Sequence, residues 1–92
     1  MKFMTTWKVR PDAVKEAVSM FFKGMAAPRK GVKFLGRWHA ADLTGGFTLT
    51  ETDNPTLIYE QSAIWIAVLD LKIVPVIEDD EAGPVLAKVF GK

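Results

Sequence analysis

The side chains best suited to acid–base chemistry in this sequence are His39 and, two residues before it, Arg37. Histidine is the side chain whose ordinary pKa lies nearest neutral pH, and His39 is the single histidine of the chain. Residues two apart in a strand point to the same face. There His39 would act as a base or hydrogen-bond donor, and Arg37 would hold an anionic or enolate-like oxygen. The alternative is that His39 only organises a hairpin end or a subunit contact.

A second group of candidate residues is aromatic. Trp7, Trp38 and Trp65 stand beside several phenylalanines in a chain of 92 residues. Aromatic rings with a few polar groups typically line small-molecule pockets, to which Tyr59 would add a hydroxyl group. The same rings would equally form the core between a sheet and its helices, with Tyr59 at the surface.

Glu51 is a carboxylate predicted on an otherwise aromatic sheet face, near Phe34 and the start of the second helix. Desolvation there would raise its pKa, as acid–base catalysis often requires. Alternatively, Glu51 reaches solvent at the strand end or caps the helix. Glu51 therefore joins Trp7, Trp38, Tyr59 and Trp65 as a candidate ligand-binding residue.

Several classes of site are excluded or disfavoured. The chain has no cysteine and one histidine, which excludes disulfides, a thiolate nucleophile and a multi-histidine metal site. The acidic run from Glu78 to Glu81 is expected to be solvated at a helix start rather than to bind a metal. Gly45-Gly46 resembles a hairpin turn more than a phosphate-binding loop. We therefore expect no cofactor and no metal.

Charge and hydropathy limit the kinds of partner that the protein is expected to bind. Twelve Lys and Arg residues against eleven Asp and Glu residues give a net charge of +1, which argues against nucleic-acid binding. The longest apolar run, from Ala63 to Leu69, is far shorter than the roughly 20 residues that span a bilayer. With no signal-peptide pattern at Met1, we expect a cytoplasmic protein without a membrane partner. The length fits a single domain, residues 1–92.

Hydrophobic periodicity predicts four strands and three helices. Asn54-Pro55 indicates the start of the second helix, an N-cap residue followed by proline in the first turn. Pro84 is expected in the first turn of a short C-terminal helix. The predicted strands are 2–9, 32–39, 46–52 and 72–77; the first helix runs from Pro11 to Pro28, and the second from residue 55 to about 68.

The second and third strands form a predicted hairpin. Pairing His39 with Gly46 puts Arg37 opposite Thr48, and directly opposite residues share a face. One face then carries Phe34, Trp38, Phe47 and Leu49, which we expect under the helices. The other carries Arg37, His39, Thr48 and Thr50, which with Leu35, Met4, Thr6, Val74 and Val76 would leave a half-apolar face open.

The order β-α-β-β-α-β plus a terminal helix is the ferredoxin-like arrangement of the α+β class. It places the second and fourth strands at the sheet edges, and Pro75 suits an edge because proline cannot donate to a ladder. A half-apolar sheet face in water is a candidate association surface. We expect a homodimer packed face to face through the sheets.

Four segments resemble a small, mostly bacterial family of unknown function: Met1-Lys2-Phe3-Met4 with Trp7-Lys8, Leu35-Gly36-Arg37-Trp38-His39, Gly45-Gly46-Phe47 and Val74-Pro75-Val76. The resemblance covers nearly the whole chain, and Gly-Arg-Trp-His is its most specific part. That family is grouped with the dimeric α/β-barrel superfamily, which implies two ferredoxin-like protomers whose sheets close into one barrel. The superfamily includes cofactor-independent monooxygenases, haem-degrading enzymes and isomerases, so it does not settle the chemistry.

Three classes of function remain. The first is a non-catalytic homodimer that binds a small apolar or aromatic molecule, which the aromatic set favours. The second is a cofactor-independent oxygenase or isomerase in which His39 and Arg37 handle protons and charge. The third is a protein-association module whose sheet face binds a partner other than itself.

Overall fold

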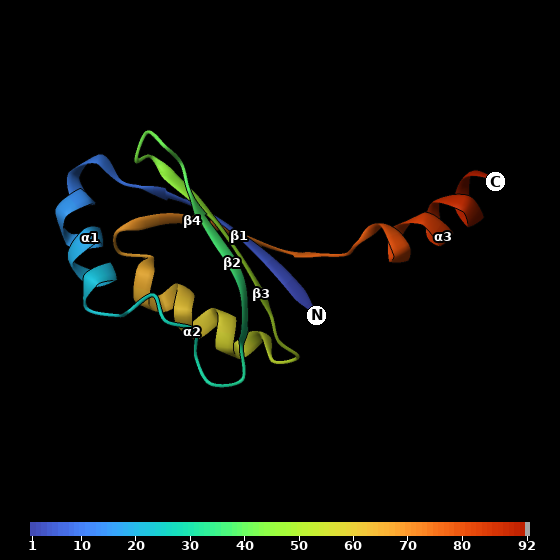
Figure 1. The fold of residues 1–92 in the computed structure, drawn as a ribbon, viewed down its shortest axis with the longest axis horizontal. Coiled ribbons are helices and arrows are strands. Elements are labelled where there is room, and N and C mark those ends of the chain that lie inside the picture. The colour runs from blue at the N-terminus through green and yellow to red at the C-terminus, as the bar shows by residue number, and fades with distance from the viewer. Residues whose placement is uncertain (92) are drawn as a thin grey trace.

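The computed structural model describes residues 1–91 and contains one antiparallel sheet with three α-helices (Figure 1). Helices α1 and α2 lie on the same side of the sheet, whereas α3 extends away from it (Figure 1). No helix in the described residues is long and apolar enough to cross a membrane. The elements in chain order are β1 (Lys2–Val9), a 3-10 turn (Pro11–Ala13), α1 (Val14–Phe22), β2 (Lys33–His39), β3 (Gly45–Glu51), α2 (Pro55–Trp65), β4 (Leu69–Val76) and α3 (Asp79–Phe90).

Local sequence signals explain how α2 begins and where α1 ends. The Asn54 side chain accepts a hydrogen bond from the Thr56 amide at 3.0 Å, and Pro55 occupies the first turn, as predicted. Helix α1 ends at Phe22, earlier than the predicted stop at Pro28. Gly24 has a φ of 81°, the left-handed conformation that terminates helices, so it ends α1 before the proline is reached.

The strand order is β2-β3-β1-β4, which confirms the ferredoxin-like α+β fold. Strand β4 lies at an edge, as Pro75 requires, and begins at Leu69 rather than the predicted Lys72. Gly45 and Gly46 belong to β3 and not to the turn before it. A Cβ atom on Gly46 would lie 2.1 Å from the Trp38 carbonyl oxygen, so close backbone approach explains this glycine.

The hairpin register is partly as predicted. His39 pairs with Gly46, and Arg37 with Thr48, as expected. The register then shifts between Phe34 and Gly36, so Phe34 pairs with Thr50 instead of Glu51. This shift is a β-bulge with one extra residue, which moves the side chains before it to the opposite face.

The prediction of which hairpin face meets the helices is wrong. Arg37 pairs with Thr48, which pairs with Thr5 of β1, and all three face the helices. Trp38 pairs with Phe47, which pairs with Thr6, and these lie on the open face. The prediction assumes that the more apolar hairpin face is the buried one, but pairing with β1 fixes the faces, and β1 places the hairpin aromatics outside.

The buried core is small and lies toward one end of the two layers. It consists of Ala17, Trp65, Val68 and Leu69, and Val68 is 1% exposed. Most of the remaining space between the sheet and the two helices is not filled by buried side chains, and it forms the cavity described below.

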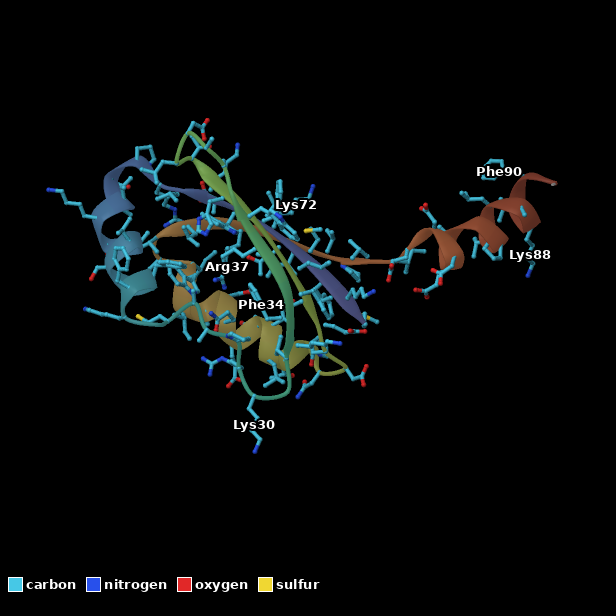
Figure 2. All side chains as sticks on the ribbon, viewed as in Figure 1. Lys30, Phe34, Arg37, Lys72, Lys88 and Phe90 are labelled. Atoms are coloured by element: carbon cyan, nitrogen blue, oxygen red, sulfur yellow. The ribbon has the colours of Figure 1, made fainter. Side chains whose placement is uncertain are left out.

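Helix α3 stands apart from this body (Figures 1 and 2), and Phe90 near its end projects into solvent (Figure 2). It begins at Asp79, so Pro84 lies inside the helix and not in its first turn as predicted. Proline has no amide hydrogen, so the Asp80 carbonyl loses its helical partner. The exposed apolar side chains of α3 are Val85, Leu86, Val89 and Phe90, between 55% and 75% exposed.

Candidate functional site: a cavity between the sheet and the helices

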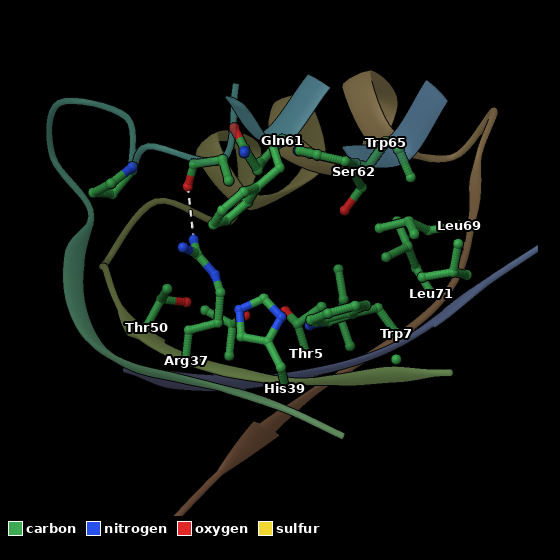
Figure 3. A pocket seen from close by; sticks show the side chains of 18 of the residues that line it. Thr5, Trp7, Arg37, His39, Thr50, Gln61, Ser62, Trp65, Leu69 and Leu71 are labelled. Carbon is green, nitrogen blue, oxygen red and sulfur yellow. Dashed lines mark hydrogen bonds between the residues drawn. The ribbon is translucent and has the colours of Figure 1, made fainter. Parts of the chain in front are cut away.

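A cavity of about 360 Å³ lies between the inner sheet face and helices α1 and α2 (Figure 3). This volume lies within the usual range for small-molecule sites, roughly 300–1,000 Å³. Most of the wall is apolar, including Trp7 on the sheet and Trp65 on α2. None of the described residues that line the cavity is aspartate or glutamate. The cavity is therefore an apolar space whose polar groups are neutral or cationic.

Arg37 is the cation that extends from the sheet toward the helices (Figure 3). Its Nη2 donates a hydrogen bond to the Ala26 carbonyl at 2.7 Å. The Phe34 ring centroid lies 4.8 Å from the Arg37 Cζ atom, and that of Phe21 lies 5.8 Å from it, both within cation–π range. Burial lowers the pKa of the Arg37 guanidinium, which nevertheless stays protonated at physiological pH.

His39 lies on the same strand and the same face as Arg37 (Figure 3). Its ring meets Trp7 edge to face at 5.3 Å between centroids and Phe21 at 5.7 Å. His39 is classed as exposed, so its ring lies at the edge of the cavity and not in the core. An imidazole held between aromatic rings and open to solvent can exchange protons with a ligand oxygen.

Hydroxyl and amide groups complete the polar lining. Thr50 Oγ1 is buried and has no hydrogen-bond partner. Ser62 donates to the Ile58 carbonyl at 3.0 Å, and Gln61 donates to the Met25 carbonyl at 2.9 Å. Thr50 therefore offers an unused hydroxyl to a bound molecule, while the other two side chains are already engaged by backbone.

The structure brings together four of the seven predicted site residues: Arg37, His39, Trp7 and Trp65 all line the cavity. Trp38 does not, because it lies on the open sheet face with 52% of its surface exposed. Tyr59 is 76% exposed on the outer side of α2.

Glu51 is also outside the cavity. It pairs with Lys2 on the open face, so the prediction that it points toward the helices is wrong. Glu51 shares the face of Phe47 and Leu49, and pairing with β1 makes that face the open one. The bulge in β2 moves only Phe34, which takes an inward position opposite Thr50.

Sequence reasoning missed several lining residues, among them Phe21, Thr50 and Ser62. Ser62 could have been found, because it lies four residues after Ile58 and three before Trp65 on the apolar stripe of its helix. A polar residue inside such a stripe is a signal of a polar cavity wall. The signal for Thr50 is its position on the same predicted hairpin face as Arg37 and His39.

The loop between β2 and β3 borders the cavity through Ala40 and Leu43. Leu43 has a φ of 70° and is the one non-glycine residue with positive φ in the described chain. Asp42 restrains this loop, since its carboxylate accepts hydrogen bonds from the Thr44 hydroxyl at 2.6 Å and the Thr44 amide at 3.1 Å. These bonds hold the pKa of Asp42 below its usual value.

Two helices on one face of a four-stranded antiparallel sheet, with a cavity between the layers, define an α+β protein of ferredoxin-like fold. Residues 1–90 match the family described as a domain of unknown function, DUF3303, and the chain belongs to that family. The expected membership in a family of unknown function is thereby confirmed.

Among solved structures, that of Rv0793 from Mycobacterium tuberculosis is similar to this chain. The two sequences are 12% identical, the match covers 84% of this chain and 94% of that chain, and the TM-score is 0.49. No curated protein matches the sequence. The function must therefore be argued from the cavity itself.

Proposed function

We propose that this protein is a homodimer that binds a small, largely apolar or aromatic molecule in the cavity between its sheet and its helices. The observation that carries the proposal is the cavity of about 360 Å³, whose wall is mostly apolar and whose few polar groups include Arg37, His39 and Thr50. Ligand sites generally combine an apolar wall with a few polar groups that fix orientation.

The homodimer is supported by the composition of the open sheet face. This face carries Met4, Trp38, Phe47, Leu49 and Val74, and Trp38 and Phe47 are each about half exposed. The same face also carries charged residues, among them Lys8, Glu51 and Lys72. Large exposed apolar side chains rimmed by polar ones are typical of an association site. Two ferredoxin-like protomers packed through such faces would form the dimeric α/β barrel that the sequence resembles.

The open face alone is smaller than the surface that a stable dimer buries. Four strands about 4.8 Å apart and about eight residues long cover roughly 500 Å² in projection. A stable interface buries about 800 Å² on each partner. The apolar side of α3, which has little contact with its own body, supplies further surface. In the proposed dimer, the second copy therefore covers both the open face and α3.

The test of the binding proposal uses N-phenyl-1-naphthylamine, a neutral probe that fluoresces in apolar sites. We expect the wild-type protein to bind it and the Ser62→Phe variant to lose that binding, because the new ring occupies the cavity. Ser19→Phe is the matched control, since Ser19 is exposed on α1 and does not line the cavity. Equal binding by all three proteins would overturn the assignment of the ligand to the cavity.

Native mass spectrometry of the freshly purified protein tests the assembly. We expect a dimer, and extra mass that disappears in a denaturing run would identify a retained ligand. A monomer at micromolar concentration would overturn the homodimer and favour the third class of function, in which the open face binds a different protein.

A cofactor-independent oxygenase or isomerase is the second candidate, favoured by the placement of His39 beside Arg37 on one cavity wall. His39 would remove a proton from an activated phenol or enol, while Arg37 would stabilise the resulting oxyanion. A bound compound that is recovered unchanged after incubation with oxygen would contradict the oxygenase interpretation. His39→Gln should then affect ligand binding alone, with the fold intact.

A further inference from the structure

We propose that Arg37 makes the cavity selective for flat molecules that carry a single carboxylate group. This inference rests on the proposed function, because it assigns a ligand class to the same cavity. It begins from a guanidinium that the described chain leaves without an acidic partner.

The surroundings of Arg37 are unusual for a partly buried cation. Its one hydrogen-bond acceptor among residues 1–91 is the Ala26 carbonyl, and no ion pair in the described chain includes it. An arginine side chain offers five N–H donors, so most of its donors remain free. Removing a charge from water without a counter-charge costs free energy. A ligand anion would supply the missing partner.

The aromatic rings beside Arg37 restrict its position. Phe34 and Phe21 lie within cation–π distance of the guanidinium, and the bond to Ala26 engages Nη2. A guanidinium held in this way presents a planar edge, and planar edges bind carboxylates through two parallel N–H···O bonds. Lysine at the same position would keep the charge but lose both the planar edge and the stacking.

The charge of the cavity indicates one negative group and not several. Arg29 also lines the cavity, but its Nε lies 3.9 Å from a Glu60 carboxylate oxygen, so this cation already has a partner. The contact with Glu60 is an ion pair and not a hydrogen bond, since the buried Arg29 Nε has no hydrogen-bond partner. Arg37 is therefore the one guanidinium of the described cavity wall that has no ion-pair partner. A monoanion matches it, whereas a phosphate monoester, which carries close to two charges at neutral pH, would remain undercompensated.

The remaining wall indicates the shape of the ligand body. Trp7 and Trp65 face the cavity from opposite layers, and the ring of His39 stands edge to face against Trp7 (Figure 3). Aromatic walls favour flat, unsaturated bodies, because ring faces and edges pack closely against them. Thr50 Oγ1, which has no partner in the described chain, would bond to a second polar group of the ligand.

The experiment compares 2-naphthoate with 2-naphthamide by isothermal titration calorimetry at neutral pH. The two probes share their shape and differ in charge. We expect the wild-type full-length protein to bind naphthoate about 10- to 100-fold more tightly, as charge-assisted hydrogen bonds imply. Arg37→Met should bring the ratio of the naphthoate and naphthamide affinities close to one, because the charge that distinguishes the two probes is then unrecognised.

Two matched controls localise the effect. Arg29→Met removes the paired cation from the same cavity, and Arg10→Met removes an arginine that bonds to Asp70 outside it. Both variants should keep the preference for naphthoate. A loss in Arg29→Met as large as that in Arg37→Met would overturn the assignment to Arg37.

The outcomes separate this inference from the proposed function. If the wild-type protein binds both probes equally, selectivity for an anion is wrong while the apolar binding site stands. If it binds neither these probes nor N-phenyl-1-naphthylamine, both proposals are wrong. The comparison of probes on the wild-type protein remains decisive even if Arg37→Met fails to fold.

Discussion

Each face of the sheet carries a few side chains that do not match its surroundings, although the inner face is mostly apolar, as at Trp7 and Leu71, and the open face also carries charged residues, as at Lys8 and Lys72. The inner face, under the helices, carries Thr5, Arg37 and Thr50, whereas the open face carries Trp38 and Phe47. Polar groups on an inner face cost free energy of folding unless they are hydrogen-bonded. Aromatic rings that stay exposed to water do not contribute the free energy that burial would give. The proposed function accounts for both groups of side chains, because it assigns a ligand to the inner face and a second copy of the chain to the open face.

The largest expected effect concerns the core that closes one end of the inner layer. Trp65 is 8% exposed and packs with Val68 and Leu69. Trp65→Ala should lower the free energy of unfolding by about 3–5 kcal/mol, since large cavities in cores cost this much. Urea unfolding at a fixed protein concentration measures the change.

The matched control for Trp65 is another aromatic residue of α2. Tyr59 is 76% exposed, so Tyr59→Ala should change stability by less than about 0.5 kcal/mol. Equal losses in the two variants would show that the helix contributes through its backbone alone, and that the inner layer has no core at Trp65.

The second expected effect separates the two faces directly. Trp38→Glu places a charge on the open face beside Phe47 and should raise the dissociation constant of the proposed dimer by about 100-fold or more, as expected for a large aromatic residue of an interface. Sedimentation over a dilution series measures it. The cavity lies on the other side of the sheet, so binding of the neutral probe should persist in the resulting monomer.

Tyr59→Glu is the control for that charge, because it alters an exposed aromatic residue away from the open face. It should leave the dimer intact. A dimer that tolerates Trp38→Glu would contradict packing through the sheets and would leave α3 as the candidate interface.

Helix α3 provides a smaller and independent test. Val89 is 66% exposed on the apolar side of α3, and Val89→Asp should weaken the dimer by about 10-fold, an effect of about 1.4 kcal/mol. Ala87→Asp introduces the same charge on nearly the opposite side of the helix, given about 100° per residue, and should have little effect. Equal dissociation constants for both variants and the wild type would show that α3 does not contact the second copy.

The sequence predicts those features of the fold that depend on residues close together in the chain. The Asn54 cap, the edge position of Pro75 and the pairing of His39 with Gly46 follow from short-range chemistry, and the structure confirms them. The predicted end of α1 is wrong because it relies on Pro28 and overlooks Gly24 as the stop. Gly24 and Pro28 are both helix-ending signals, and Gly24, which comes first along the chain, determines where α1 ends.

The orientation of the hairpin was beyond the reach of the sequence. A hairpin taken alone has two faces of unequal polarity, and burying the apolar one is the natural inference. The pairing of Thr5 with Thr48 across β1 and β3 decides otherwise. This non-local register places Arg37 and His39 at the cavity and Trp38 on the open face, and the prediction of which hairpin face meets the helices is wrong for that reason.

The smallest expected effect concerns the loop at the edge of the cavity. The Thr44 hydroxyl and amide both donate to Asp42, which holds the pKa of this carboxyl below its ordinary value of 3.8. A depressed folded-state pKa stabilises the fold above the unfolded value and loses that contribution as pH falls through the folded value. The window therefore lies below about pH 3.8.

Thr44→Val tests this linkage, because it removes the hydroxyl donor, the largest cause of the shift, and keeps the backbone amide. A carbon-detected NMR titration should show the pKa of Asp42 rising toward its ordinary value. Since Asp42 is fully exposed, the change in stability should be slight. The loop carries Leu43 at positive φ beside the cavity, so probe binding should weaken in this variant. The proposed dimer, packed through the open face, should be unchanged. Equal weakening of probe binding and of dimerisation would mean that the two sheet faces are coupled through the hairpin and do not act as separate surfaces.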